Sequence, residues 1–105
     1  MANCNDTEII EIAKRYTGIV KKELNISHVY LFGSYVKGNY SNDSDIDILL
    51  IGEGFTGDLV DDTYKLMKLR RKIDKRIEPH PIKSSDFKET NQFFKEVIET
   101  GIRIM

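Results

Sequence analysis

The stretch that decides the fold is residues 29–51, VYLFGSYVKGNYSNDSDIDILLI. It begins with an apolar run, Val29–Phe32, which predicts a short buried strand ending at Gly33. A second apolar run, Ile46–Ile51, is rich in β-branched residues and predicts another strand. Residues 34–44 between the two runs are polar and contain glycine, which predicts a short helix and then a turn rich in Ser, Asn and Asp.

Helical periodicity precedes and follows this strand–helix–strand unit. Apolar residues recur every three or four positions over residues 5–24, residues 58–73 and a last helix around residues 93–98. Asn5 with Glu8 resembles a capping box at the start of the first helix. Asp58 is placed to cap the second helix, and Gly101 is placed to end the last one.

A third strand is predicted at Arg76–Ile82. Its two prolines place it at a sheet edge or a strand end, because proline has no N–H for the hydrogen-bond ladder. The tail, residues 102–104, alternates apolar and charged side chains and could dock as a short strand. Strands alternate with helices, so we expect one α/β domain over residues 1–105, with helices on at least one face of a small sheet.

The composition is that of a globular domain with little excess charge. The 105 residues include 16 Lys and Arg and 17 Asp and Glu, a net charge of −1. This balance removes the main electrostatic argument for a nucleic-acid or membrane-surface binder. The single cysteine, Cys4, allows no internal disulfide and no cysteine-based zinc site. We expect a cytoplasmic protein, because the N-terminus is too polar for a signal peptide and no apolar run has membrane-spanning length.

Gly33 and Ser34 form one candidate binding element. A glycine after a buried strand lets the backbone turn sharply and approach a ligand. The helix that follows begins with unpaired N–H groups and a partial positive charge, which suit a phosphate, and the Ser34 hydroxyl adds a donor. Taken alone the pattern is weak, because strand-Gly-Ser-helix turns are common.

Asp45 and Asp47 form the second candidate element. The period of a strand puts both carboxylates on one face, while Ile46 and Ile48 face the core. Like charges side by side on a strand repel, so a bound cation would compensate them, and oxygen ligands suit Mg²⁺ or Mn²⁺. For an isolated Asp-x-Asp, the competing interpretation is an acidic turn at the start of a strand.

Together the two elements are far more specific than either alone. Ten residues separate Ser34 from Asp45. The pattern Gly-Ser, ten residues, Asp-x-Asp resembles the signature of nucleotidyltransferases of the DNA polymerase beta superfamily, and Gly38 and Ser44 also stand where that family has them. The chain is similar to a minimal nucleotidyltransferase domain, the small stand-alone branch of the superfamily. The resemblance implies a polymerase beta-like α/β fold, a mixed sheet of three or four strands with flanking helices.

The resemblance also implies the site residues. Asp45 and Asp47 would be catalytic and would bind metal, together with a third carboxylate on the next strand. Glu78 stands at that position, although the family often has the shorter Asp there; Asp74 is the competing carboxylate and lies at the end of a predicted helix. The residues implied to bind the nucleotide are Gly33, Ser34, Lys37, Gly38 and Ser44. Many relatives have Arg in place of Lys37, and Lys keeps the charge but not the two-pronged donor.

The function implied by the resemblance is transfer of a nucleoside monophosphate, AMP from ATP, to a hydroxyl group, with two Mg²⁺ ions (or Mn²⁺) as cofactors. The chain is too short to hold a separate acceptor domain. Minimal nucleotidyltransferases are often encoded beside a helical HEPN-domain toxin, and act as antitoxins that adenylylate a tyrosine of it. A HEPN-domain partner is therefore expected, and a homo-oligomer would also supply missing surface.

Two other functions compete with this one. The protein could neutralise its partner by complex formation alone, with a weak nucleotide site, as the departure at Glu78 suggests. Nucleotidyl transfer to an antibiotic or to RNA is less favoured, because the chain lacks both an acceptor domain and a positive surface.

The remaining candidates have mostly structural interpretations. His80 lies two residues after Glu78 and could share its face, whereas His28 is expected at the surface. Phe93 and Phe94 are expected in the core rather than as a base-stacking platform. Tyr35 and Tyr40 flank the loop and could be exposed, so that one of them could contact a base or accept a nucleotide.

Overall fold

The computed structural model describes residues 4–41 and 43–105, with the side chains of the first helix described from Thr7 onward. The elements follow the predicted alternation of helices and strands: α1 (Cys4–Glu23), β1 (His28–Phe32), α2 (Ser34–Lys37), β2 (Ile46–Gly52), α3 (Leu59–Arg70), β3 (Ile77–Lys83), the 3₁₀ turn η1 (Ser84–Asp86), α4 (Gln92–Thr100) and β4 (Ile102–Arg103).

The strands form one mixed four-stranded sheet in the order β3-β2-β1-β4. β1 pairs antiparallel with both β2 and β4, whereas β2 and β3 are parallel. The register sets Phe32 opposite Asp47 and Asp47 opposite Glu78, so these three residues form a row across the sheet. The mixed sheet with flanking helices confirms the predicted fold class.

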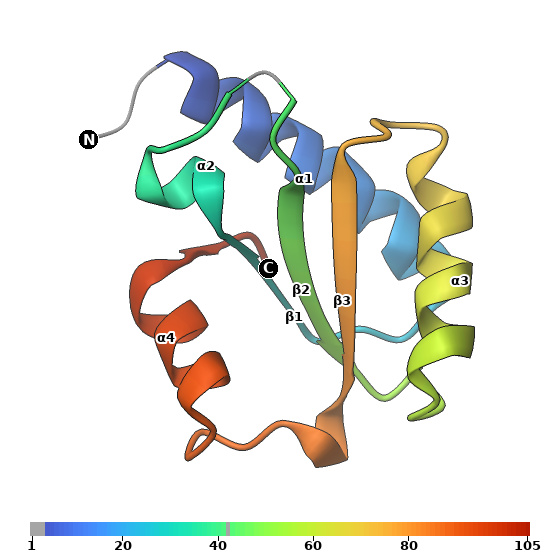
Figure 1. The fold of residues 1–105 in the computed structure, drawn as a ribbon. Helices are drawn as coiled ribbons and strands as arrows, with labels where there is room; N and C mark the ends of the chain where they lie inside the picture. The colour runs from blue at the N-terminus through green and yellow to red at the C-terminus, as the bar shows by residue number, and fades with distance from the viewer. Residues whose placement is uncertain (1–3, 42) are drawn as a thin grey trace.

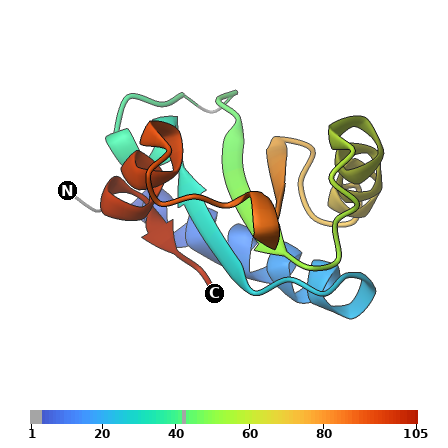
Figure 2. The same ribbon diagram turned by 90° about the horizontal axis from the view of Figure 1, so that it is seen from below.

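Helices cover both faces of this sheet (Figures 1 and 2), with α1 and α3 on one side and α4 on the other. Ile46, Ile48 and Leu50 of β2 are buried in the cluster that includes α1 and α3. Leu49 and Ile51 point the other way and pack with α4. The central strand is therefore apolar without a break because both of its faces are buried.

β3 is an edge strand, as its prolines predicted. The Ile46 N–H donates to the Arg76 carbonyl at 2.8 Å, which fixes the direction of the alternating backbone groups of β3. In this register Glu78 and His80 turn their backbone groups toward β2, and Pro79 and Pro81 turn theirs toward the open edge. The hydrogen-bond ladder between β2 and β3 therefore needs no N–H group at either proline.

The observed ends of the elements differ from the predicted ends by only a few residues. α1 begins at Cys4, so Asn5 lies inside the helix rather than at its start, and its side chain is outside the described part. Asp58 does cap α3, where it accepts from the N–H groups of Val60 and Asp61. α3 ends at Arg70 rather than Ile73, and Gly101 follows α4 as predicted.

No helix within residues 4–41 and 43–105 combines the length and the apolar character needed to cross a bilayer.

Candidate active site

The turn after β1 brings the backbone of Gly33 against the carboxylate of Asp47. Gly33 has a φ of +85°, in the region that other residues rarely adopt. A Cβ atom at this position would overlap Asp47 Oδ2, so the close approach needs glycine for space as well as for backbone conformation. The two elements predicted from the sequence, the glycine turn and the Asp-x-Asp pair, therefore meet in space.

A cluster of acidic and imidazole side chains lies beside this turn. Asp47 and Glu78 are register partners on β2 and β3, and His80 follows Glu78 on the same face of β3. His80 Nε2 lies 3.2 Å from Asp47 Oδ1 and 3.7 Å from Glu78 Oε1. One ligand atom from each of these three residues lies within 4.8 Å of the others.

The environment of Glu78 is strongly acidic. A hydrogen bond to Asp45 raises the pKa of the Glu78 carboxyl above its usual range, and partial burial and the charge of Asp47 act in the same direction. Asp45 is exposed, and its side chain is linked to the cluster by this hydrogen bond to Glu78. Grouped carboxylates of this kind have the chemistry of a divalent-cation site, since a cation would relieve their repulsion.

The other predicted nucleotide-binding residues lie along α2 and the loop after it. Ser34 is the first residue of α2, and Gly38 ends the helix in the left-handed conformation with φ +87°. Ser44 accepts a hydrogen bond from the Ser41 N–H at 2.9 Å, so its hydroxyl holds the loop. Lys37 forms an exposed ion pair with Glu96 of α4 at 3.7 Å.

Tyr35, Arg76 and Asp74 form a partly buried brace behind this loop, which the sequence did not predict. Tyr35, considered as an exposed residue, is only 5% exposed because its ring stacks on Tyr40 with centroids 4.5 Å apart. Its hydroxyl donates to the Ser41 carbonyl at 3.1 Å and accepts from Arg76 Nη1 at 3.2 Å. Arg76 in turn holds Asp74 through Nε and Nη2, at 3.0 and 2.8 Å. Asp74 is thus engaged by Arg76 in a turn after α3, which favours Glu78 as the third carboxylate.

Asp74→Asn tests this brace. Arg76 lowers the pKa of the Asp74 carboxyl below its ordinary value of 3.8, so the pair stabilises the fold fully above that value and progressively less as the pH falls through the folded-state pKa. We expect the variant to lose about 1–2 kcal/mol of unfolding free energy at pH 7. The loss should shrink below about pH 4. Urea unfolding at pH 7 and pH 3 measures it, and an equal loss at both values would contradict the assignment.

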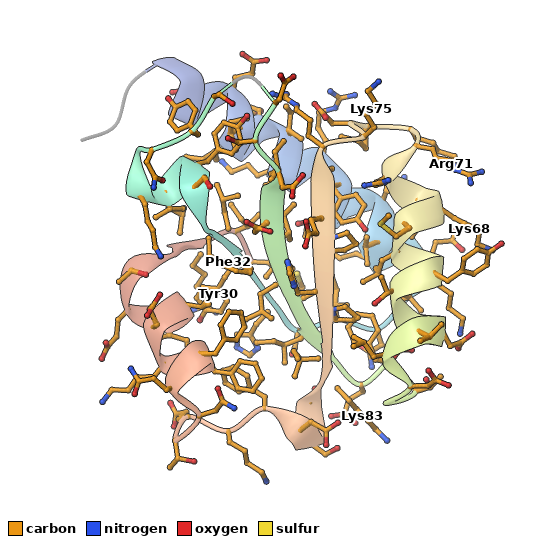
Figure 3. All side chains as sticks on the ribbon, viewed as in Figure 1. Tyr30, Phe32, Lys68, Arg71, Lys75 and Lys83 are labelled. Atoms are coloured by element: carbon orange, nitrogen blue, oxygen red, sulfur yellow. The ribbon has the colours of Figure 1, made fainter. Side chains whose placement is uncertain are left out.

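A groove of about 650 Å³ runs from the carboxylates along the edge strand. Asp45, Glu78 and His80 line one part of it. The rest is lined by apolar residues of α3, β3 and α4, together with Thr63 and Arg70 of α3. Phe93, predicted to be in the core, is 46% exposed here, whereas Phe94 is buried as predicted. Phe32, the last residue of β1 and labelled in Figure 3, packs its ring against His80 and Phe93 with centroid distances of 5.1 and 5.5 Å.

The class of protein follows from this fold and site together with a match to a family profile. The profile described as Polymerase beta, Nucleotidyltransferase matches residues 8–105, nearly the whole chain. The chain belongs to this nucleotidyltransferase family.

Relatives in Methanocaldococcus jannaschii match part of this chain. Two of them, each named "Putative protein adenylyltransferase", are 43% identical over 42 residues and 44% identical over 48 residues. These matches cover 40% and 42% of this chain and 36% and 46% of the relatives. The chain therefore spans less than half the length of the curated relatives it matches.

Solved structures share the fold at low sequence identity. A "putative nucleotidyltransferase" from Sulfolobus solfataricus has a TM-score of 0.62 at 23% identity, over 93% of this chain and 80% of that one. A toxin–antitoxin structure with AMP-PNP has a TM-score of 0.63 at 18% identity, over 88% of this chain and 72% of that one. A mutant form of the toxin–antitoxin MntA–HpeT has a TM-score of 0.54 at 17% identity, over 95% of this chain and 72% of that one.

Proposed function

We propose that the protein transfers AMP from ATP to a hydroxyl group of a protein, and that it acts as an antitoxin by modifying a tyrosine of a HEPN-domain toxin. The observation that carries the proposal is the approach of Gly33 to Asp47, with Glu78 beside it on β3. The family, the relatives named as adenylyltransferases and the toxin–antitoxin neighbours support it. A cytoplasmic location belongs to the same proposal.

The phosphate-binding part of the proposed mechanism uses the turn and α2. Gly33 and Ser34 hold the β- and γ-phosphates through the first N–H groups of α2 and the Ser34 hydroxyl. Gly38 and Ser44 shape the segment that follows, and Lys37 supplies positive charge nearby. In this arrangement the protein contributes mainly by positioning the triphosphate.

The carboxylates carry the chemical step. Asp45, Asp47 and Glu78 would hold two Mg²⁺ ions, which neutralise the charge that develops on the phosphates. The acceptor oxygen forms a bond to the α-phosphorus, the bond from that phosphorus to pyrophosphate breaks, and the acceptor proton passes to Glu78. The groove along β3 leaves room for an acceptor side chain next to these residues.

Incubation with ATP labelled at the α-phosphate, Mg²⁺ and the HEPN-domain partner tests the proposal. We expect label on the partner, and a loss of at least about 1,000-fold in Asp45→Asn/Asp47→Asn, because both carboxylates serve one transition state. Asp43→Asn, a change in the same loop at an exposed residue, is the matched control and should keep normal activity.

The same experiment separates catalysis from simple binding. A double variant that transfers no AMP and no longer neutralises the toxin supports the enzymatic proposal. A double variant that still neutralises the toxin supports the competing function, a non-catalytic binding module. Near-normal transfer by the double variant would overturn the assignment of the carboxylates.

A further inference from the structure

We propose that His80 is a direct metal ligand, and that Asp47, Glu78 and His80 form a mixed oxygen–nitrogen site that binds Mn²⁺ in preference to Mg²⁺. The inference rests on the cation site of the proposed function and departs from an all-carboxylate set. It concerns which atoms hold the cation and hence which cation the protein prefers.

The spacing of the three side chains fits a common ion. Two neighbouring ligands of an octahedral ion, each about 2.1 Å from it, are about 3 Å apart. His80 Nε2 and Asp47 Oδ1 are 3.2 Å apart, close to this value. His80 Nε2 and Glu78 Oε1 are 3.7 Å apart. Glu78 is the most exposed of the three side chains, so its carboxylate has room to move toward the other two ligand atoms.

The imidazole is held in this orientation by its surroundings. Glu78 and His80 project from the same face of β3, and Asp47 faces them from β2. The ring packs against Phe32 at 5.1 Å, and its side chain is 32% exposed. All three side chains therefore stand on paired strands rather than on loops, which suits a preorganised metal site.

A nitrogen ligand changes which cation is favoured. Mg²⁺ prefers oxygen ligands and loses its water reluctantly. Imidazole is a frequent ligand of divalent transition metals, and Mn²⁺ is the one among them that also suits carboxylate oxygens, as Mg²⁺ does. To bind the cation, the neutral ring would carry its proton on Nδ1 and turn the Nε2 lone pair toward an ion held between the two carboxylates. Since losing a group that only orients a metal ligand already costs about 10- to 100-fold in affinity, the nucleotide-free protein should bind Mn²⁺ about tenfold more tightly than Mg²⁺.

Pulsed electron paramagnetic resonance of the full chain with Mn²⁺ alone tests the ligand directly. We expect a ¹⁴N coupling to the bound Mn²⁺ in the unmodified protein. The coupling should disappear in His80→Gln and persist in the matched control His28→Gln, since His28 is exposed at the far end of β1. Because the first measurement needs no variant, it stands even if His80→Gln folds poorly.

Affinities measured by calorimetry with Mn²⁺ and Mg²⁺ complete the test. His80→Gln should weaken Mn²⁺ binding about 10-fold or more and change Mg²⁺ binding much less. His80→Asp, which would give a set of oxygen ligands only, should bring the affinities for Mn²⁺ and Mg²⁺ closer together. Absence of ¹⁴N coupling in the unmodified protein, or a coupling that survives His80→Gln, would overturn the inference. Neither readout depends on AMP transfer, so a failure here is distinguishable from a failure of the proposed function.

Discussion

Gly33→Ala is expected to lower AMP transfer at least about 100-fold, because displacements of about 1 Å among reacting groups have effects of this size. The new methyl group would overlap the Asp47 carboxylate and would sit on a backbone with φ +85°. Either Asp47 or the turn must move, and both belong to the proposed site. Initial rates with ATP and the acceptor measure the loss, and thermal unfolding reports the accompanying destabilisation.

Gly57→Ala is the matched control for this change. Gly57 also has a positive φ, +94°, but a Cβ there would meet only the far end of the Lys83 side chain, at an ordinary contact distance of 3.9 Å. Both variants should therefore lose about 1 kcal/mol of stability from backbone strain, whereas only Gly33→Ala should lose most of the activity. Equal losses of activity would show that backbone strain, and not displacement of Asp47, is responsible.

Asp62→Ala is expected to produce the largest loss of stability, about 3 kcal/mol of unfolding free energy. Asp62 is only 3% exposed. Its carboxylate accepts from the N–H and hydroxyl of Thr56 at 2.9 and 3.0 Å and from the Gly57 N–H at 3.1 Å. Truncation leaves these donors without their acceptor at the entry to α3. Urea unfolding should show the loss, and thermal unfolding should show a midpoint temperature lower by more than about 10 °C.

Asp61→Ala, one residue earlier on the same helix, is the control for Asp62. Asp61 is exposed and pairs with Lys65 at 3.4 Å on the surface. Such a pair contributes little, so the variant should lose less than about 1 kcal/mol. A loss at Asp62 no greater than that at Asp61 would mean that the loop at residues 56–57 does not depend on the buried carboxylate.

Local patterns in the sequence were sufficient to predict the elements of the fold. The apolar runs at Val29–Phe32 and Ile46–Ile51 correspond to β1 and β2. A strand that is buried on both faces has apolar residues at successive positions instead of alternating apolar and polar ones. Pro79 and Pro81 placed β3 at an edge, since an inner strand needs its N–H groups on both sides. The spacing from Ser34 to Asp45 indicated that the glycine turn and the two aspartates form one site. In the structure Gly33 does lie against Asp47.

Contacts between distant segments could not be predicted in the same way. The brace formed by Tyr35, Arg76 and Asp74 joins residues 41 positions apart, and no local period links them. The sequence also did not decide the directions of the strands. In the structure β2 is parallel to β3 and antiparallel to β1, and this arrangement aligns Asp47 with Glu78. The exposure of Phe93 depends on the distance between α4 and β3, which is set by tertiary packing and not by the local sequence.

The prolines at the open edge of β3 also restrict how this protein can assemble. A foreign strand adding to that edge would need N–H donors where Pro79 and Pro81 have none. The opposite edge, β4, is only two residues long. Growth by continuing the sheet, whether into a dimer or a fibril, is therefore disfavoured at both edges. We expect any partner protein to contact side-chain surfaces rather than to add a strand to the sheet.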